Sequence, residues 1–128
     1  MDPVSNMLNG IKNANRALRE TVIVPQSKLS LAIAEKLSKE GFVGAVEKKT
    51  RQGRPVLEIA LIATDRMPKI SEINRVSKSS RRMYAGVADI KPIKNGRGLL
   101  ILSTPKGLLT DKEARKENVG GEVMFSIW

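Results

Sequence analysis

The 128-residue sequence contains no cysteine and no histidine. Disulfides, thiolate or imidazole metal sites and the usual Ser-His or Cys-His nucleophile pairs are therefore excluded. No apolar stretch approaches the roughly 20 residues of a membrane-spanning helix, and no signal-peptide pattern opens the chain. We accordingly expect a cytoplasmic protein that does not enter a membrane.

Aromatic residues are also scarce. They are Phe42, Tyr84, Phe125 and Trp128. A protein that stacks several RNA bases on a sheet needs a platform of aromatic side chains. The sequence argues against a broad platform of this kind, although a single ring can still stack on one base.

Acidic residues are few beside the basic ones, with 13 Asp and Glu against 23 Lys and Arg and a net charge of +10. Residues 1–65 hold 10 basic and 7 acidic side chains (+3), whereas residues 66–128 hold 13 and 6 (+7). Between Arg66 and Lys106 the ratio is 10 to 2. This asymmetry favours a polyanion as the partner of the second half over a surface that serves only solubility.

The hydrophobic pattern predicts an α+β fold in two small modules, residues 1–66 and 67–128. The first module reads as α-β-α-β-β. Its helices are expected to begin at a cap on Asp2 with Pro3 next, and at a cap on Ser27, with Gly41 ending the second. The expected strands are residues 21–24, 42–49 and 54–63. The expected inward positions of the helices are Val4, Met7, Leu8, Ile11, Leu18, Leu29, Ile33, Ala34 and Leu37.

The second module reads as mainly antiparallel β with one short helix. Residues 70–77 are expected to be extended, residues 99–102 to form a buried strand, and residues 123–127 to form a last strand that alternates apolar and polar positions. Thr110 and Glu113 have the spacing of a capping box, which predicts a helix from about Asp111 to Glu117. The segment 83–91 follows no clear pattern, and a turn and a single helical loop both remain open for it.

Two loops of small and polar residues adjoin these strands. They are Ser103, Thr104, Pro105, Lys106 and Gly107 after one strand, and Gly120, Gly121 and Glu122 before the other. Hydroxyls donate and accept, glycines permit positive φ and close approach, and a carboxylate accepts from a base amine. These groups suit the edges of unpaired RNA bases. The alternatives are an ordinary strand-to-helix connection and a turn with an exposed carboxylate.

A cationic turn precedes the only tyrosine. Lys78, Arg81 and Arg82 can neutralise phosphates, and Tyr84 can stack on a base or lie against a ribose. The alternative for Tyr84 is a core residue with a satisfied hydroxyl. Other cations of this half, which the sequence does not rank, are Lys91, Lys94 and Arg97.

The first module offers a secondary set of candidate RNA contacts. A polar face on the first helix and the N-terminus of the second, whose free N–H groups attract phosphate, carry this prediction. A solvated helical surface is an equal alternative. The residues are Asp2, Pro3, Lys12, Asn13, Asn15, Arg16, Ser27 and Lys28.

The order of several short motifs resembles the bacterial small-subunit ribosomal protein S8 family over nearly the full length. The motifs are Asp2-Pro3, Asn13-Ala14-Asn15, Pro25-Gln26-Ser27-Lys28, Glu40-Gly41-Phe42, Arg75-Val76-Ser77-Lys78, Arg82-Met83-Tyr84, Asn95-Gly96-Arg97-Gly98, Ser103-Thr104 with Gly107, Thr110-Asp111 and Gly120-Gly121-Glu122. The family usually has serine where this chain has Pro105, so one hydroxyl and one backbone N–H are missing there.

The resemblance implies a structural protein of the small (30S) ribosomal subunit that is not an enzyme and uses no metal, no cofactor and no small-molecule substrate. It implies binding to an irregular helix in the central domain of 16S rRNA, mainly through the second module, with support of platform assembly. Ribosomal protein S5 and its neighbours are the implied protein partners, and the messenger RNA of the protein's own operon is a possible further target.

Two other functions compete with this reading. Net charge alone also fits a DNA-binding or nucleoid protein, although the sequence shows no recognition helix, basic arm or half-site spacing. A nuclease or phosphoryl-transfer enzyme would need carboxylates around Mg²⁺, and those present are scattered, without a phosphate-cradling Gly-Lys-Ser/Thr loop. The carboxylates in question are Asp65, Asp89, Asp111 and Glu122.

Overall fold

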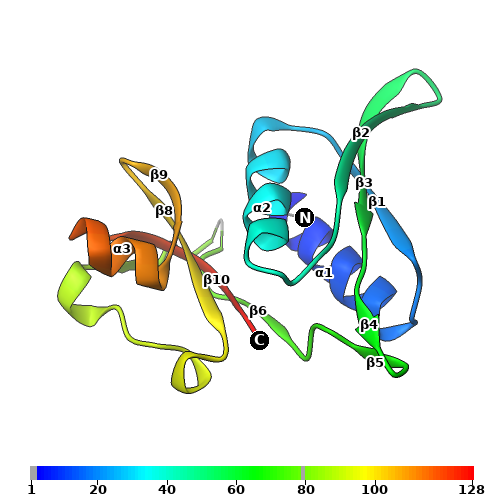
Figure 1. The fold of residues 1–128 in the computed structure, drawn as a ribbon. Coiled ribbons are helices and arrows are strands. Elements are labelled where there is room, and N and C mark those ends of the chain that lie inside the picture. The colour runs from blue at the N-terminus through cyan, green and yellow to red at the C-terminus, as the bar shows by residue number, and fades with distance from the viewer. Residues whose placement is uncertain (1–2, 79) are drawn as a thin grey trace. The chain divides into compact units, whose positions relative to one another are not determined.

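The computed structural model describes residues 3–78 and 80–128, which fall into two compact units, residues 3–70 and 71–128 (Figure 1). The sequence placed the division at 66/67. The Asn15 side chain accounts for the later position, because its Oδ1 accepts a hydrogen bond from the Ile70 N–H at 2.9 Å. The chain is therefore tied to the first unit as far as Ile70.

The first unit has the predicted order of elements, with a helical layer on a three-stranded antiparallel sheet ordered β1-β3-β2. The elements are α1 (Pro3–Arg16), β1 (Thr21–Pro25), α2 (Lys28–Lys39), β2 (Val46–Arg51) and β3 (Arg54–Ala60), followed by a small hairpin of β4 (Ala63–Thr64) and β5 (Met67–Pro68). Leu57 and Ile59 alternate along β3, and both are completely buried. In α2, Leu37 is completely buried and Ile33 is 1% exposed. The α+β class is confirmed.

Three local predictions for this unit are wrong, namely the inward positions of Leu18 and Leu29 and the start of the strand at Phe42. Leu18 and Leu29 were expected to point inward but are 45% and 41% exposed, since α1 ends at Arg16 and Leu29 lies in the first turn of α2. The strand expected from Phe42 begins at Val46, because the Phe42 and Val43 N–H groups bond to the Leu37 carbonyl in the turn that closes α2. The predicted cap at Asp2 lies outside the described residues.

The second unit is a mainly antiparallel sheet with one short helix, as predicted. Its strands run in the order β6-β10-β8-β9, and β7 pairs with the start of β10. The elements are β6 (Ile73–Arg75), β7 (Tyr84–Ala85), β8 (Leu99–Thr104), β9 (Gly107–Thr110), α3 (Asp111–Glu117) and β10 (Gly121–Ile127), with 3-10 turns at Val87–Asp89 and Lys94–Gly96. Leu102, Val123, Ala114 and Ile90 form one buried cluster at its centre.

The α3 helix has the predicted bounds and the predicted capping box. The Thr110 hydroxyl accepts from the Glu113 N–H at 3.2 Å, and the Glu113 carboxylate accepts from the Thr110 N–H at 3.0 Å. The last strand differs from its pattern, because every residue from Val123 to Ile127 is buried rather than every second one. A shift in register between Val123 and Phe125 leaves Met124 as an irregularity in the pairing with β8.

Candidate nucleic-acid interface

Three candidate residues of the second unit meet in one row across the sheet. Glu122 on β10 lies opposite Tyr84 on β7 and, on its other side, opposite Ser103 on β8. Neighbouring strands lie about 4.8 Å apart, and residues directly opposite one another share a face of the sheet. Tyr84, Glu122 and Ser103, hereafter the cross-strand row, therefore present their side chains together although they are distant in sequence.

The exposure of the cross-strand row leaves it open to a ligand at both ends. Tyr84 is 71% exposed, which is contrary to the alternative of a core tyrosine. Ser103 is exposed, and its hydroxyl makes no hydrogen bond to any of the described residues. The row thus offers a ring and a free hydroxyl on either side of a carboxylate.

Thr104 differs from its neighbour because its hydroxyl serves the protein's own hairpin. It donates to the Gly107 carbonyl at 2.8 Å and accepts from the Lys106 N–H at 3.1 Å. Pro105 and Lys106 form the exposed two-residue turn between β8 and β9, where the sequence predicted a strand-to-helix loop. Gly107 has φ +107° and no atom near the position of a Cβ, so the turn requires glycine there for its backbone conformation.

The positive φ predicted for Gly120 and Gly121 is wrong, and their close approach to RNA stays a prediction. Neither has positive φ. A Cβ on Gly121 would lie 2.2 Å from the Ser103 carbonyl oxygen, and a Cβ on Gly120 would lie 2.3 Å from the Ala85 carbonyl oxygen. The two glycines therefore let β10 approach β8 and the end of β7 closely, and they bring Glu122 between Tyr84 and Ser103.

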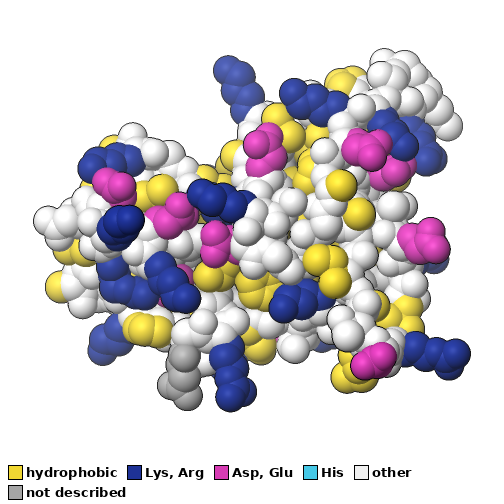
Figure 2. All heavy atoms as spheres, viewed as in Figure 1, with side chains coloured by type: hydrophobic (Ala, Val, Ile, Leu, Met, Phe, Trp, Pro, Cys, Tyr) yellow, Lys and Arg dark blue, Asp and Glu magenta, His cyan; other side chains and the backbone are white. Residues whose placement is uncertain are grey.

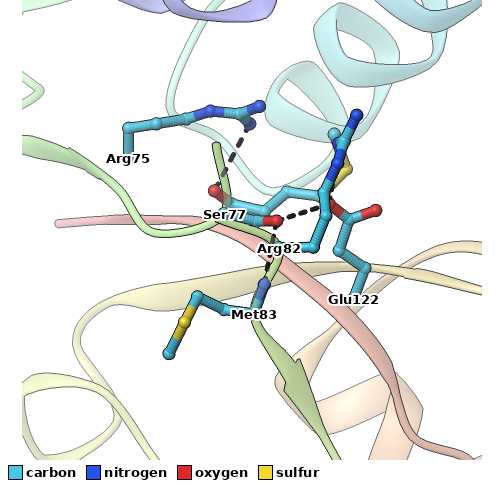
Figure 3. A network of polar contacts seen from close by, with 6 residues as sticks. Arg75, Ser77, Arg82, Met83 and Glu122 are labelled. Carbon is cyan, nitrogen blue, oxygen red and sulfur yellow. Dashed lines mark hydrogen bonds and ion pairs between the residues drawn. The ribbon is translucent and has the colours of Figure 1, made fainter. Parts of the chain in front are cut away.

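Glu122 is the centre of a network of polar contacts (Figure 3). Its Oε2 accepts hydrogen bonds from the Ser77 hydroxyl and from Nη1 of Arg82, the latter at 3.0 Å. The completely buried Ser77 also accepts from the Met83 N–H at 3.1 Å. Nearby, Nη1 of Arg75 donates to the Met124 carbonyl at 3.4 Å.

The network keeps Glu122 ionised. The hydrogen bond from Ser77 lowers the pKa of Glu122, burial opposes this, and the hydrogen bond and charge of Arg82 lower the pKa further. Both contacts go to Oε2, and no described residue donates to Oε1. A charged carboxylate therefore remains in the row with one oxygen available to a donor such as a base amine.

The other predicted cations of this unit differ in their contacts. The backbones of Lys78 and Arg81 bond reciprocally, at 2.9 and 3.0 Å, and both side chains are exposed. Arg82 is the ion-pair partner of Glu122. Nζ of Lys106 forms a solvent-exposed ion pair with Oε2 of Glu117 at 3.2 Å. Figure 2 shows basic side chains spread over the surface in view rather than gathered in a single band.

The secondary candidates lie in the first unit, and one of them is wrong. Asn15 is only 1% exposed, and its amide donates to the Ile62 carbonyl at 3.0 Å while its Oδ1 accepts from Ile70. Its side chain is therefore committed to the fold. The remaining described members are exposed or half-buried. They are Pro3, Lys12, Asn13, Arg16, Ser27 and Lys28, and Asp2 is outside the described residues.

Ser27 also has a local role. Its hydroxyl accepts from the Ser30 N–H at 3.0 Å, and the Ser30 hydroxyl accepts from the Ser27 N–H at 2.8 Å, which completes a capping box at the start of α2. One of the N–H groups that were expected to attract phosphate is thus already bonded.

Ser77 is the functional candidate that the sequence reasoning missed. It belongs to the motif Arg75-Val76-Ser77-Lys78, but nothing in its local pattern shows that its side chain reaches a carboxylate 45 positions away.

The carboxylates of the enzyme alternative do not form a common site. Asp111 is buried and pairs with Arg115 at 3.3 Å, whereas Glu122 belongs to the network with Ser77 and Arg82. The described residues contain no group of three potential metal ligands, and none of their helices has the length and apolar character to span a membrane.

Comparison with known proteins supplies an independent finding. The model of the family described as Ribosomal protein S8 matches residues 2–128. A protein of Caulobacter vibrioides (strain NA1000 / CB15N) is 45% identical over 128 residues, which cover 99% of this chain and 97% of the relative. A protein of Thermus aquaticus is 42% identical over 135 residues, covering 99% and 98%. Both relatives are named small ribosomal subunit protein uS8.

Proposed function

The chain belongs to the ribosomal protein S8 family, and on that premise we propose that it is a structural constituent of the small ribosomal subunit that binds the central domain of 16S rRNA and supports platform assembly. The match to the family model and the identity to its members confirm the resemblance that the sequence motifs indicate. The RNA target, the contact residues and the protein partners belong to the proposal.

The cross-strand row is the observation that supports this proposal most. A hydroxyl, a charged carboxylate with one free oxygen and an exposed ring lie side by side, which is a set of groups suited to unstacked bases. Irregular RNA exposes such bases, whereas side chains cannot read the base edges in the deep, narrow major groove of a regular A-form helix. Ser103 and Glu122 would read base edges, and Tyr84 would stack or contact a ribose.

The neighbouring cations would hold the RNA against the row. Lys78, Arg81 and Lys106 are exposed residues of the same unit, and Arg82 is held beside Glu122. Contacts of this kind fix register and orientation, and base contacts supply the sequence preference. Lys12, Asn13, Arg16 and Lys28, with Pro3 and Ser27, would supply further contacts from the first unit.

The wider setting follows from the family. We place the protein in the ribosome, with S5 and neighbouring small-subunit proteins as partners. Binding to the messenger RNA of its own operon would use the same row if that messenger presents a similar irregular helix. A general DNA-binding role is the second candidate, and it is supported only by the net charge of +10.

Substitution of Ser103 tests the proposal. Because its hydroxyl is unused within the fold, Ser103→Ala should reduce the preference for a central-domain 16S rRNA transcript over random-sequence RNA of equal length by roughly 1 kcal/mol or more, the scale of one base contact. Dissociation constants at one fixed salt concentration measure this preference.

Ser71→Ala is the matched control. Ser71 is an exposed serine of the same unit whose side chain has no described contact, and its backbone N–H bond to the Trp128 carbonyl is retained by alanine. This variant should leave the preference unchanged. An equal loss of affinity for both RNAs in Ser103→Ala would contradict the assigned contact. Binding of duplex DNA by the wild-type protein as tightly as the transcript would favour the DNA-binding alternative.

A further inference from the structure

The tip of the β2–β3 hairpin extends beyond the rest of its sheet (Figure 1). The pairing of β1 with β3 ends at Pro25 and Val56, whereas β2 and β3 continue through the pairs Thr50–Pro55 and Arg51–Arg54. All residues from 50 to 55, hereafter the hairpin tip, are exposed. The tip is therefore a two-stranded ribbon that contributes nothing to the hydrophobic core.

Two arginines face each other directly at this tip. Arg51 and Arg54 are a cross-strand pair, and like charges in this position repel. Neither arginine has an acidic partner among the described residues, and the same holds for exposed Lys48. The pair therefore destabilises the end of the ribbon, and an anion bound between the two guanidinium groups would relieve the repulsion.

Lys49 on the same ribbon shows the contrast. Its Nζ lies 3.0 Å from Glu58 and 3.7 Å from Glu47, so its charge is balanced within the sheet. The acidic residues of this face thus lie toward the base of the hairpin, and the tip holds uncompensated cations. A surface that served only solubility would not need this separation of charge.

We propose that the hairpin tip binds the phosphate backbone of a nucleic acid through Arg51 and Arg54, independently of sequence. The guanidinium fork matches the oxygens of a phosphate, and a ribbon that projects from its sheet can follow a strand. An acidic protein surface fits less well, because residues 50–55 hold no aromatic side chain and no apolar side chain larger than Pro55, whereas protein interfaces need large buried anchors.

This contact lies in the first unit and is separate from the cross-strand row. The identity of the nucleic acid as RNA rests on the proposed function, whereas the phosphate contact itself does not.

The salt dependence of binding tests the phosphate contact, because each neutralised phosphate contributes about 0.7–0.9 to the slope of log K against log salt concentration. The double variant Arg51→Gln/Arg54→Gln should therefore lower the magnitude of the slope by about 1.5, for a central-domain 16S rRNA transcript and for random-sequence RNA alike.

Two further variants make the measurement decisive. Arg51→Lys/Arg54→Lys keeps both charges and should retain most of the wild-type slope. Arg19→Gln/Arg66→Gln removes the same charge from two other exposed positions of the same unit and should change the slope by less than half as much. An unchanged slope for Arg51→Gln/Arg54→Gln, or the same loss in the control double variant, would overturn the proposal.

The outcome is distinguishable from that of the proposed function. Failure of the proposed function would appear as a wild-type protein with no preference between the two RNAs, whatever the slope. Failure of the hairpin contact would appear as an unaltered slope on both RNAs, whatever the preference. An acidic peptide would be the partner of the hairpin tip if two results came together. Polyglutamate would compete with RNA for the wild-type protein, and Arg51→Gln/Arg54→Gln would leave the salt slope of RNA binding unchanged.

Discussion

Ser103 and Thr104 show how two adjacent hydroxyls take different roles. The Thr104 hydroxyl has both a donor and an acceptor contact inside the turn, and the Ser103 hydroxyl has neither among the described residues. The sequence correctly marked both as residues of a strand end. It could not separate their roles, because the distinction depends on the turn geometry of Pro105 and Lys106, which was predicted as a loop before a helix.

Asn15 is the residue for which a sequence signal was present and overlooked. It follows Ile11 by four positions and so lies on the buried stripe of α1 rather than on its polar face. A polar residue on such a stripe needs partners within the protein, and the Ile62 carbonyl and the Ile70 N–H provide them. Those partners lie 47 and 55 residues away, which is why the pattern alone did not identify them.

Gly121 leads to a prediction at this scale. Gly121→Ala places a methyl group against the Ser103 carbonyl, so β8 and β10 must separate, and we expect the free energy of unfolding to fall by about 1–3 kcal/mol. Urea denaturation followed by the fluorescence of Trp128 measures this, because the only tryptophan lies in the same unit.

Gly86→Ala is the control for that substitution. Gly86 has φ −77°, and the atom nearest to the place a methyl group would take is the Asp89 carboxylate oxygen at 3.9 Å, so alanine fits without displacement. Its unfolding free energy should stay close to that of the wild-type protein. Equal stability of Gly121→Ala and Gly86→Ala would show that close approach of β10 to β8 is not required.

At the scale of elements, local signals predicted the helices and missed the shortest strands. The α3 helix carries its own capping residues, so its bounds follow from a few neighbouring positions. The strands β7 and β9 span two and four residues, too few for an alternating pattern to be visible. Their existence depends on hydrogen bonds to β10 and β8, which are partners that the local sequence does not specify.

The capping box of α3 allows a prediction for this element. Thr110→Ala removes the hydroxyl that accepts from the Glu113 N–H, and we expect a loss of about 1 kcal/mol of unfolding free energy. Thr110→Ser keeps the hydroxyl and should recover most of this difference. The same Trp128 fluorescence measurement applies, and equal destabilisation by both variants would assign the effect to the lost methyl group of a buried side chain instead.

At the scale of the whole molecule, the sequence shows directly that the second half carries most of the excess charge, and its choice of RNA-contacting residues stays a prediction. It could not predict that Tyr84, Glu122 and Ser103 share one row, because strand order and register determine this. The sequence also does not show which cations of residues 48–54 have an acidic partner. The partner of Lys49 becomes evident only when β2 and β3 are paired. Composition thus limits the classes of ligand to be considered, and sheet topology decides which side chains lie together on one surface.

The pH dependence of stability follows from the same topology. Because Ser77 and Arg82 lower the pKa of Glu122 in the folded protein, the network stabilises the fold at pH values above the ordinary pKa of glutamate, and this stabilisation is lost as the pH falls through the lowered value. The net charge of +10 becomes more positive over the same range, so repulsion also increases. We therefore expect the unfolding free energy to decline below about pH 4 for two separate reasons.

Glu122→Gln separates these two effects. The variant keeps a side-chain oxygen but not the charge, so its unfolding free energy at pH 7 should be lower by about 1–2 kcal/mol, and the difference from wild type should shrink as the pH falls and Glu122 itself becomes protonated. Glu117→Gln, which removes an exposed carboxylate paired with Lys106, should give a curve nearly parallel to the wild-type one. Urea denaturation at a series of pH values, followed by Trp128 fluorescence, gives the three curves. A constant difference between wild type and Glu122→Gln down to about pH 2 would mean that ionisation of Glu122 does not stabilise the fold.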